Sequence, residues 1–67
     1  MQHPLRVARE TCGLTLRRAD LFTGIDYRNI ALLEKGLKPK PLELALLAAL
    51  YRVAPDQLRR SLGVEGE

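Results

Sequence analysis

Sixty-seven residues form one domain, because a chain of this length buries only about 60% of the surface that its unfolded form exposes. The composition, 46% apolar and 28% charged, is typical of a globular domain and not of a disordered or membrane-spanning chain. One cysteine, Cys12, and one histidine, His3, exclude an internal disulfide and leave no metal site. We therefore expect a cytoplasmic protein with no signal peptide, membrane span, cofactor or small-molecule ligand.

The net charge is +3, but two acidic residues, Glu65 and Glu67, lie in the last three positions. The part of the chain that is expected to fold is therefore more basic than the total indicates. A basic surface of this size fits nucleic acid, an anionic membrane or an acidic protein partner, and charge alone does not choose among them.

Glycines and prolines divide the chain into short blocks, in which apolar residues recur at intervals of three and four. This spacing predicts helices rather than strands. The first helix is expected from about Pro4 to Thr11, because proline suits a first-turn position, where its missing amide hydrogen would have no partner. The second is expected from Thr15, whose hydroxyl can cap it, to Gly24.

A third and a fourth helix flank a basic loop. The third is expected to begin with Asp26 as its cap and to stop at Gly36. Two prolines disfavour helical dihedrals across residues 37–40. Pro41 then opens a fourth helix that reaches about Tyr51 and is central to the predicted core. Its inward stripe consists of Leu44, Leu47, Ala48 and Tyr51.

The fifth helix is expected from Pro55 to Gly63, with an acidic residue in its first turn, where the helix dipole favours one. The sequence therefore predicts an all-α fold, a compact five-helix bundle over residues 1–63. The remaining residues, 64–67, are expected to form a flexible acidic C-terminal tail.

Residues 14–36 fit a helix-turn-helix, since a short helix, a glycine corner and a second capped helix follow one another. In such a pair the second helix offers its N-terminal side chains to the DNA major groove. Tyr27, Arg28 and Asn29 precede Ile30, the first residue expected to point inward, so we expect them to face solvent or a ligand.

At these positions the chain resembles the Cro/repressor-type (XRE) helix-turn-helix family, with a lambda-repressor-like bundle, from Leu5 to about Leu62. The resemblance implies that the domain binds operator double-stranded DNA as a homodimer. It also implies a buried structural ion pair between Arg9 and Glu34. The matching residues are Leu5, Arg6, Ala8–Glu10, Gly13–Thr15, Gly24, Ile25, Ile30, Leu33–Gly36, the proline-marked loop, Leu44, Leu47, Ala48, Val53, Asp56 and Leu58.

The same resemblance assigns two sets of DNA contacts. Arginine can hydrogen-bond guanine and asparagine can hydrogen-bond adenine in the major groove, while exposed basic side chains bind phosphates. The base-reading positions are Tyr27, Arg28, Asn29 and Leu32. The phosphate-binding positions are Arg17, Arg18, Lys35, Lys38 and Lys40.

Several positions depart from the family pattern. Asp20 occupies a place that usually holds a small side chain, and we expect it to turn outward or pair with an arginine. Arg52 has to end the fourth helix where the family often has glycine, and Ala54 is a poor cap for the fifth. Apolar residues occupy positions expected to be exposed, and they indicate a protein interface. They are Leu16, Leu21, Phe22, Leu32 and Leu37, with Leu21, Phe22 and Leu37 as the candidate interface.

Each of these residues also has a plainer interpretation. Arg28 could be a solvated arginine, Asn29 could make local hydrogen bonds, and Tyr27 could be a partly packed aromatic with a solvated hydroxyl. The loop lysines could simply keep the loop soluble. Cys12 is expected to be a small apolar filler rather than a redox group.

Two functions remain open. The chain contains no nucleophile–base pair, phosphate-binding glycine loop or carboxylate cluster, so we do not expect an enzyme. The first hypothesis is a sequence-specific transcriptional regulator, most simply a small dimeric repressor. The second is a helix-turn-helix scaffold that acts as a protein-binding adaptor or inhibitor. A third helix whose beginning is covered by its neighbours, or surrounded by acidic groups, would contradict the first hypothesis.

Overall fold

A computed structural model describes residues 2–63, which form five α-helices and no strand. The predicted all-α five-helix bundle is confirmed. The tail expected over residues 64–67 lies outside the described residues. The helices are α1 (Pro4–Thr11), α2 (Leu16–Thr23), α3 (Tyr27–Glu34), α4 (Pro41–Tyr51) and α5 (Pro55–Leu62).

The predicted caps form at the beginnings of α2 and α3. The Thr15 hydroxyl accepts a hydrogen bond from the Arg18 amide at 3.1 Å, and Asp26 accepts one from the Arg28 amide at 2.8 Å. Gly24 ends α2 in the left-handed region, with φ 80°. These side chains satisfy amides that have no partner within their own helix, so they fix where each helix begins.

Two further helix ends carry less favourable residues. Arg52 ends α4 with φ 59°, a left-handed conformation in which a Cβ is strained. Ala54 gives α5 no side-chain cap. Both agree with the sequence analysis. The sequence analysis gave His3 no structural role, yet its Nδ1 accepts the Leu5 amide at 3.1 Å and caps α1.

The core lies where α4 meets the other helices. The stripe predicted on α4 is buried, and Leu5, Ile30 and Leu33 pack with it. The other side of α4, with Leu42 and Leu46, is exposed, so the predicted stripe accounts for all the buried residues of this helix. The core residues are Leu5, Ala19, Ile25, Ile30, Leu33, Leu44, Leu47, Ala48, Tyr51 and Leu58.

Cys12 differs from its prediction. It is exposed at the end of α1 rather than filling space in the core. Its thiol lies 3.5 Å from the Tyr51 carbonyl oxygen, to which it can donate. The prediction was wrong because Cys12 is the C-cap residue of α1, where the chain turns and leaves the residue accessible to solvent.

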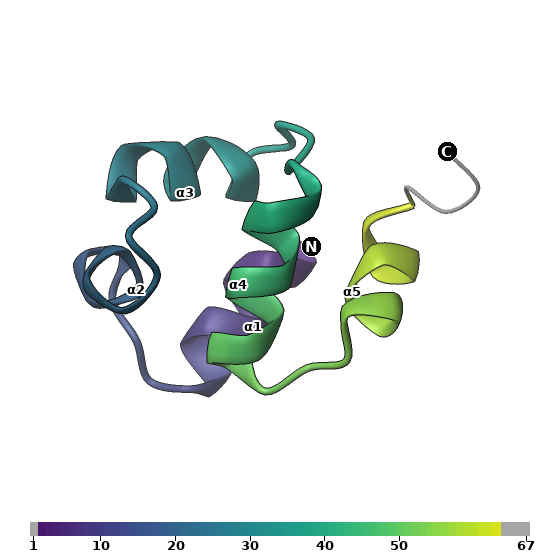
Figure 1. The fold of residues 1–67 in the computed structure, drawn as a ribbon, viewed down its shortest axis with the longest axis horizontal. Helices are drawn as coiled ribbons and strands as arrows, with labels where there is room; N and C mark the ends of the chain where they lie inside the picture. The colour runs from purple at the N-terminus through teal and green to yellow at the C-terminus, as the bar shows by residue number, and fades with distance from the viewer. Residues whose placement is uncertain (1, 64–67) are drawn as a thin grey trace.

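The other four helices lie around α4 (Figure 1). In that view α2 is seen end-on and α3 runs from left to right above it, so the two helices form the corner expected of a helix-turn-helix. On the other side of α4, α5 packs against α1 and α4. The arrangement leaves one long side of α3 at the surface of the molecule.

Candidate nucleic-acid interface

Asp20 fixes the corner between α2 and α3. Its Oδ2 accepts a hydrogen bond from the Tyr27 amide at 2.9 Å. The carboxylate therefore lies at the N-terminus of α3, where the helix dipole favours negative charge. The expectation that Asp20 turns outward or pairs with an arginine was wrong, because its carboxylate instead accepts the first backbone amide of α3.

Arg9 and Glu34 form the ion pair that the family resemblance implies. Arg9 donates from Nε to Glu34 Oε2 at 2.8 Å and from Nη2 to Oε1 at 3.1 Å. Their side chains are only 11% and 7% exposed. Arg9 also donates from Nη1 to the Leu14 carbonyl at 2.8 Å. The hydrogen bond and the charge of Glu34 raise the pKa of Arg9, and the pair joins α1 to the end of α3.

The outer side of α3 carries a stripe of three exposed residues, Arg28, Leu32 and Lys35, with Lys35 as the C-cap residue. Ile30 and Leu33 are buried on the opposite side. Side chains three and four positions apart share a face of a helix. Arg28, Leu32 and Lys35 thus form one row that points away from the core, and we call them the outer stripe of α3.

Arg28 is the one predicted base-reading residue at the beginning of α3 that projects fully. Its side chain is 75% exposed. It donates from Nε to Asp26 Oδ1 at 3.2 Å and from Nη2 to Asp26 Oδ2 at 3.1 Å. These bonds raise the pKa of Arg28 and lower that of Asp26, so both groups stay charged.

Tyr27 is half-buried, and this agrees with its plainer interpretation as a partly packed aromatic. The Arg17 guanidinium stands over its ring, with Cζ 4.5 Å from the ring centroid, and Nη2 lies 3.4 Å from the hydroxyl. Arg28 lies on the ring as well, at 5.6 Å. The Tyr27 ring therefore makes cation–π contacts with two arginines at the surface of the corner.

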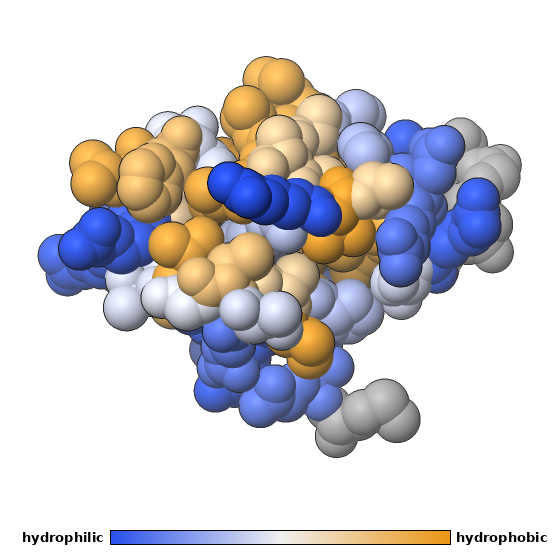
Figure 2. Space-filling model, turned by 90° about the horizontal axis from the view of Figure 1, so that it is seen from below, coloured by the Kyte–Doolittle hydropathy of each residue, from blue (hydrophilic) through white to orange (hydrophobic). Residues whose placement is uncertain are grey.

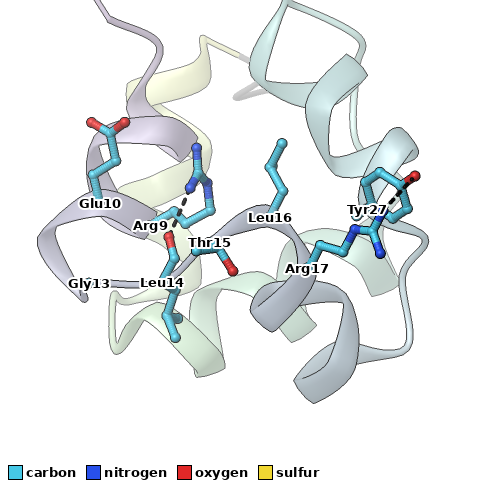
Figure 3. A pocket seen from close by; sticks show the side chains of 8 residues that line it. All are labelled: Arg9, Glu10, Gly13, Leu14, Thr15, Leu16, Arg17 and Tyr27. Atoms are coloured by element: carbon cyan, nitrogen blue, oxygen red, sulfur yellow. Dashed lines mark hydrogen bonds between the residues drawn. The ribbon is translucent and has the colours of Figure 1, made fainter.

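Arg17 and Tyr27 border a shallow open depression between the end of α1 and the beginning of α2 (Figure 3). Thr15 and Leu16 contribute to its lining. In Figure 3 the Arg17 side chain reaches across to the Tyr27 hydroxyl. The depression thus has a cationic rim on the side nearest α3.

Asn29 was expected to project into solvent, and it does not. It is half-buried, and its Nδ2 donates to Glu43 Oε2 at 2.8 Å. The other oxygen of Glu43 accepts the Lys40 amide at 2.9 Å. Glu43 therefore ties the first turn of α3 to the beginning of α4. The prediction failed because α4 packs beside Asn29 and supplies an acceptor.

The basic residues predicted to bind phosphates are all exposed. Arg17 is held against Tyr27. The other four make no ion pair with another residue among those described. They lie at the beginning of α2, at the end of α3 and in the loop before α4: Arg18, Lys35, Lys38 and Lys40.

Leu21 and Phe22, on the last turns of α2, are 75% and 59% exposed. Leu32 and Leu37 are exposed, as expected. Leu16 was also expected to be exposed, but it is partly buried and packs against the core. On the face drawn in Figure 2, apolar side chains gather across the middle, and a hydrophilic side chain lies over part of them.

Three carboxylates, those of Asp20, Asp26 and Glu43, lie around the beginning of α3. Asp20 and Glu43 are half-buried and bind amide groups, and Asp26 is paired with Arg28. This acidic surrounding counts against a DNA surface at the first turn. Arg28 lies in that turn, so these acidic groups, which the sequence analysis named as contrary to the DNA-binding hypothesis, weigh against it. Arg28 still projects from the turn, and Leu32 and Lys35 lie farther along the outer stripe.

The sequence analysis missed the roles of Asp20 and Glu43. Nothing local marks Asp20, which bonds to a residue seven positions away on another helix, and the bond from Asn29 to Glu43 spans fourteen positions. A partial signal existed for Glu43, because it stands three residues after Lys40, the spacing at which an acidic side chain can accept the cap residue's amide.

Within residues 2–63 no group of three or more His, Cys, Asp or Glu side chains could hold a metal ion. No helix there has the length and apolar character to cross a membrane. Comparison of the chain with protein-family models, with curated proteins and with solved structures finds no match.

Proposed function

We propose that the domain is a sequence-specific DNA-binding regulator, acting as a small dimeric repressor in the cytoplasm. The observation that carries this proposal is the outer stripe of α3, because it puts Arg28 on the surface at the end of a helix-turn-helix corner. Arginine is the side chain that most often reads guanine, through the O6 and N7 acceptors in the major groove.

The basic residues around the corner support the same proposal. In the sequence, Arg18 precedes the outer stripe of α3, and Lys38 and Lys40 follow the stripe, in the loop before α4. Such side chains bind phosphates and orient a helix on the duplex without reading bases. Asn29 has no base-reading role in this proposal, because Glu43 holds its amide.

A dimer follows from the size of the reading surface. One short helix offers a single arginine and two further exposed residues, which can distinguish only a few base pairs. Two copies related by a two-fold axis read two half-sites about one helical turn apart and so specify a longer operator. Bound in this way, the dimer would act as a repressor by excluding polymerase.

The test is selection from a pool of random DNA duplexes, followed by titration of the selected duplex at increasing salt. The logarithm of the affinity should fall linearly with the logarithm of the salt concentration, by about 0.9 per phosphate contact. Lys38→Ala should weaken binding to all duplexes alike and reduce this slope by about one. Equal binding to selected and scrambled duplexes, or no dependence on salt, would remove the proposal.

A second function is favoured by a separate observation, the exposure of Leu21 and Phe22. We propose as the alternative that the domain is a protein-binding adaptor or inhibitor, since exposed apolar groups of this kind mark interfaces. Phe22→Glu should then abolish binding to the partner. In gel filtration, an unchanged elution volume for Phe22→Glu and Leu32→Glu, together with unchanged partner binding, would exclude it.

A further inference from the structure

Asp26 bonds to one edge of the Arg28 guanidinium and leaves the other free. An arginine carries five N–H donors in a planar fork. Asp26 accepts from Nε and from one hydrogen of Nη2, at 3.2 Å and 3.1 Å. Both hydrogens of Nη1 and the second hydrogen of Nη2 remain. One from each nitrogen lies along the outer Nη1–Nη2 edge of the group, and the other Nη1 hydrogen points back toward Cδ.

That outer edge is the one that guanine recognition needs. A guanine offers two neighbouring acceptors, O6 and N7, and a bidentate arginine meets them with two donors from one edge. We infer that Asp26 is a positioning residue for Arg28, which holds its guanidinium so that the Nη1–Nη2 edge faces a guanine. This inference rests on the proposed DNA-binding function.

Asp26 is itself fixed, which allows it to orient a mobile neighbour. Its Oδ1 accepts the Arg28 backbone amide at 2.8 Å as the cap of α3. The Arg28 guanidinium is held further by the Tyr27 ring, 5.6 Å away. An exposed arginine ordinarily loses rotamer freedom when it binds, and a partner that orders it beforehand reduces that loss.

The two effects of Asp26 on DNA binding have opposite signs. Its negative charge repels phosphates, so it weakens binding to every duplex. Its hold on Arg28 strengthens binding only where a guanine is present. Asp26→Asn separates them, because asparagine caps helices as well as aspartate does while its side chain carries no charge.

The experiment uses two probes, the duplex that the wild-type protein selects from a random pool and the same duplex with the G·C pair read by Arg28 replaced by A·T. Arg28→Ala identifies that pair by losing the preference for it. With Asp26→Asn, both duplexes should bind more tightly, while the ratio of their affinities falls about twofold to fivefold. In the Arg28→Ala background, Asp26→Asn should leave the ratio unchanged.

Asp56→Asn is the matched control. It removes the same charge from the exposed pair that Asp56 forms with Arg59 on α5, at 3.2 Å, and should leave the ratio at its wild-type value. If Asp26→Asn does not fold, Asp26→Ser also retains a capping side chain without the charge.

The outcomes distinguish the inference from the function on which it rests. An unchanged ratio in Asp26→Asn, or an equal fall in Asp56→Asn, overturns the positioning role while DNA binding stands. A wild-type protein that prefers no duplex overturns both. A fall in the ratio confined to proteins that retain Arg28 supports the inference.

Discussion

Two arginine–carboxylate pairs in this domain have the same hydrogen-bonding pattern and opposite surroundings. Arg9 and Glu34 are joined through Nε and Nη2 inside the bundle, and Arg28 and Asp26 are joined through the same nitrogens at the surface. The first pair is almost entirely buried and the second is at least half exposed. The comparison indicates that burial, rather than the chemistry of the pair, separates the structural role of Arg9 and Glu34 from the recognition role that we propose for Arg28.

The surroundings determine what a substitution does in each place. A buried charge that loses its partner is left without water to replace it, so breaking the pair is strongly destabilising. An exposed charge that loses its partner is solvated instead, and such pairs contribute little to stability. The four predictions below test this contrast, beginning with the largest expected effect.

Glu34→Ala should destabilise the domain by about 3–5 kcal/mol, because it leaves the Arg9 guanidinium buried and unpaired. Since domains of this size have only about 5 kcal/mol or slightly more to lose, the variant should be largely unfolded at moderate denaturant concentrations. Urea denaturation followed by circular dichroism measures the change.

Glu10→Ala provides the control for that substitution. It removes the same side chain from the exposed Arg6–Glu10 pair, whose atoms are 2.9 Å apart, and should cost less than about 1 kcal/mol. Similar losses for the two variants would contradict the contrast between buried and exposed pairs.

Tyr51 extends the contrast to a neutral group beside the buried pair. Burial, with a smaller contribution from Glu34, raises the pKa of Tyr51 to about 12. Because this lies above the unfolded value of about 10, the neutral phenol stabilises the fold fully below pH 10. That stabilisation, about 2–3 kcal/mol for a shift of two pH units, should be lost as the pH rises through 12.

Tyr51→Phe isolates this effect. The hydroxyl is buried and has no hydrogen-bond partner among the described residues, so phenylalanine should raise the free energy of unfolding by about 1 kcal/mol at pH 7. The wild-type protein should lose more stability than the variant between pH 10 and pH 12 in parallel denaturation experiments. Equal losses would show that Tyr51 keeps its ordinary pKa.

Arg52 gives a smaller effect, opposite in sign to that of Glu34→Ala. It is an arginine without an ion pair among the described residues, in a left-handed conformation at φ 59°. Arg52→Gly should therefore stabilise the domain by about 0.5–1 kcal/mol, because glycine adopts this conformation without strain. A lower melting temperature for the variant would mean that the arginine stem contributes packing that outweighs the strain.

Asp26→Asn should have the smallest effect on folding. The cap of α3 is retained and the exposed pair is replaced by solvent, so the midpoint of urea denaturation should stay at the wild-type value. A loss approaching that of Glu34→Ala would erase the distinction between the two pairs.

The sequence predicted the helices well because their ends are determined by nearby residues. Thr15 and Asp26 cap helices through amides two or three positions away, and Gly24 ends α2 at the next position. Such signals need no knowledge of the rest of the fold. The inward stripe of α4 was predictable for a similar reason, since periodicity alone defines it.

The failures in the candidate site involve residues that are brought together only by packing. Asn29 meets Glu43 because α4 crosses beside α3, and Asp20 meets the Tyr27 amide because of the angle of the corner. The exposure of Arg28 was predicted correctly because this residue lies opposite the buried residues of α3.

The most direct test of DNA recognition by the outer stripe of α3 compares two arginines in matched surroundings. Arg28 and Arg59 each form an exposed pair with an aspartate near the beginning of a helix. Competition binding would measure how strongly each alanine variant prefers the selected duplex over a scrambled one. The account predicts that Arg28→Ala loses most of the preference and Arg59→Ala keeps it. Equal preference in the two variants, or none in the wild-type protein, would contradict it.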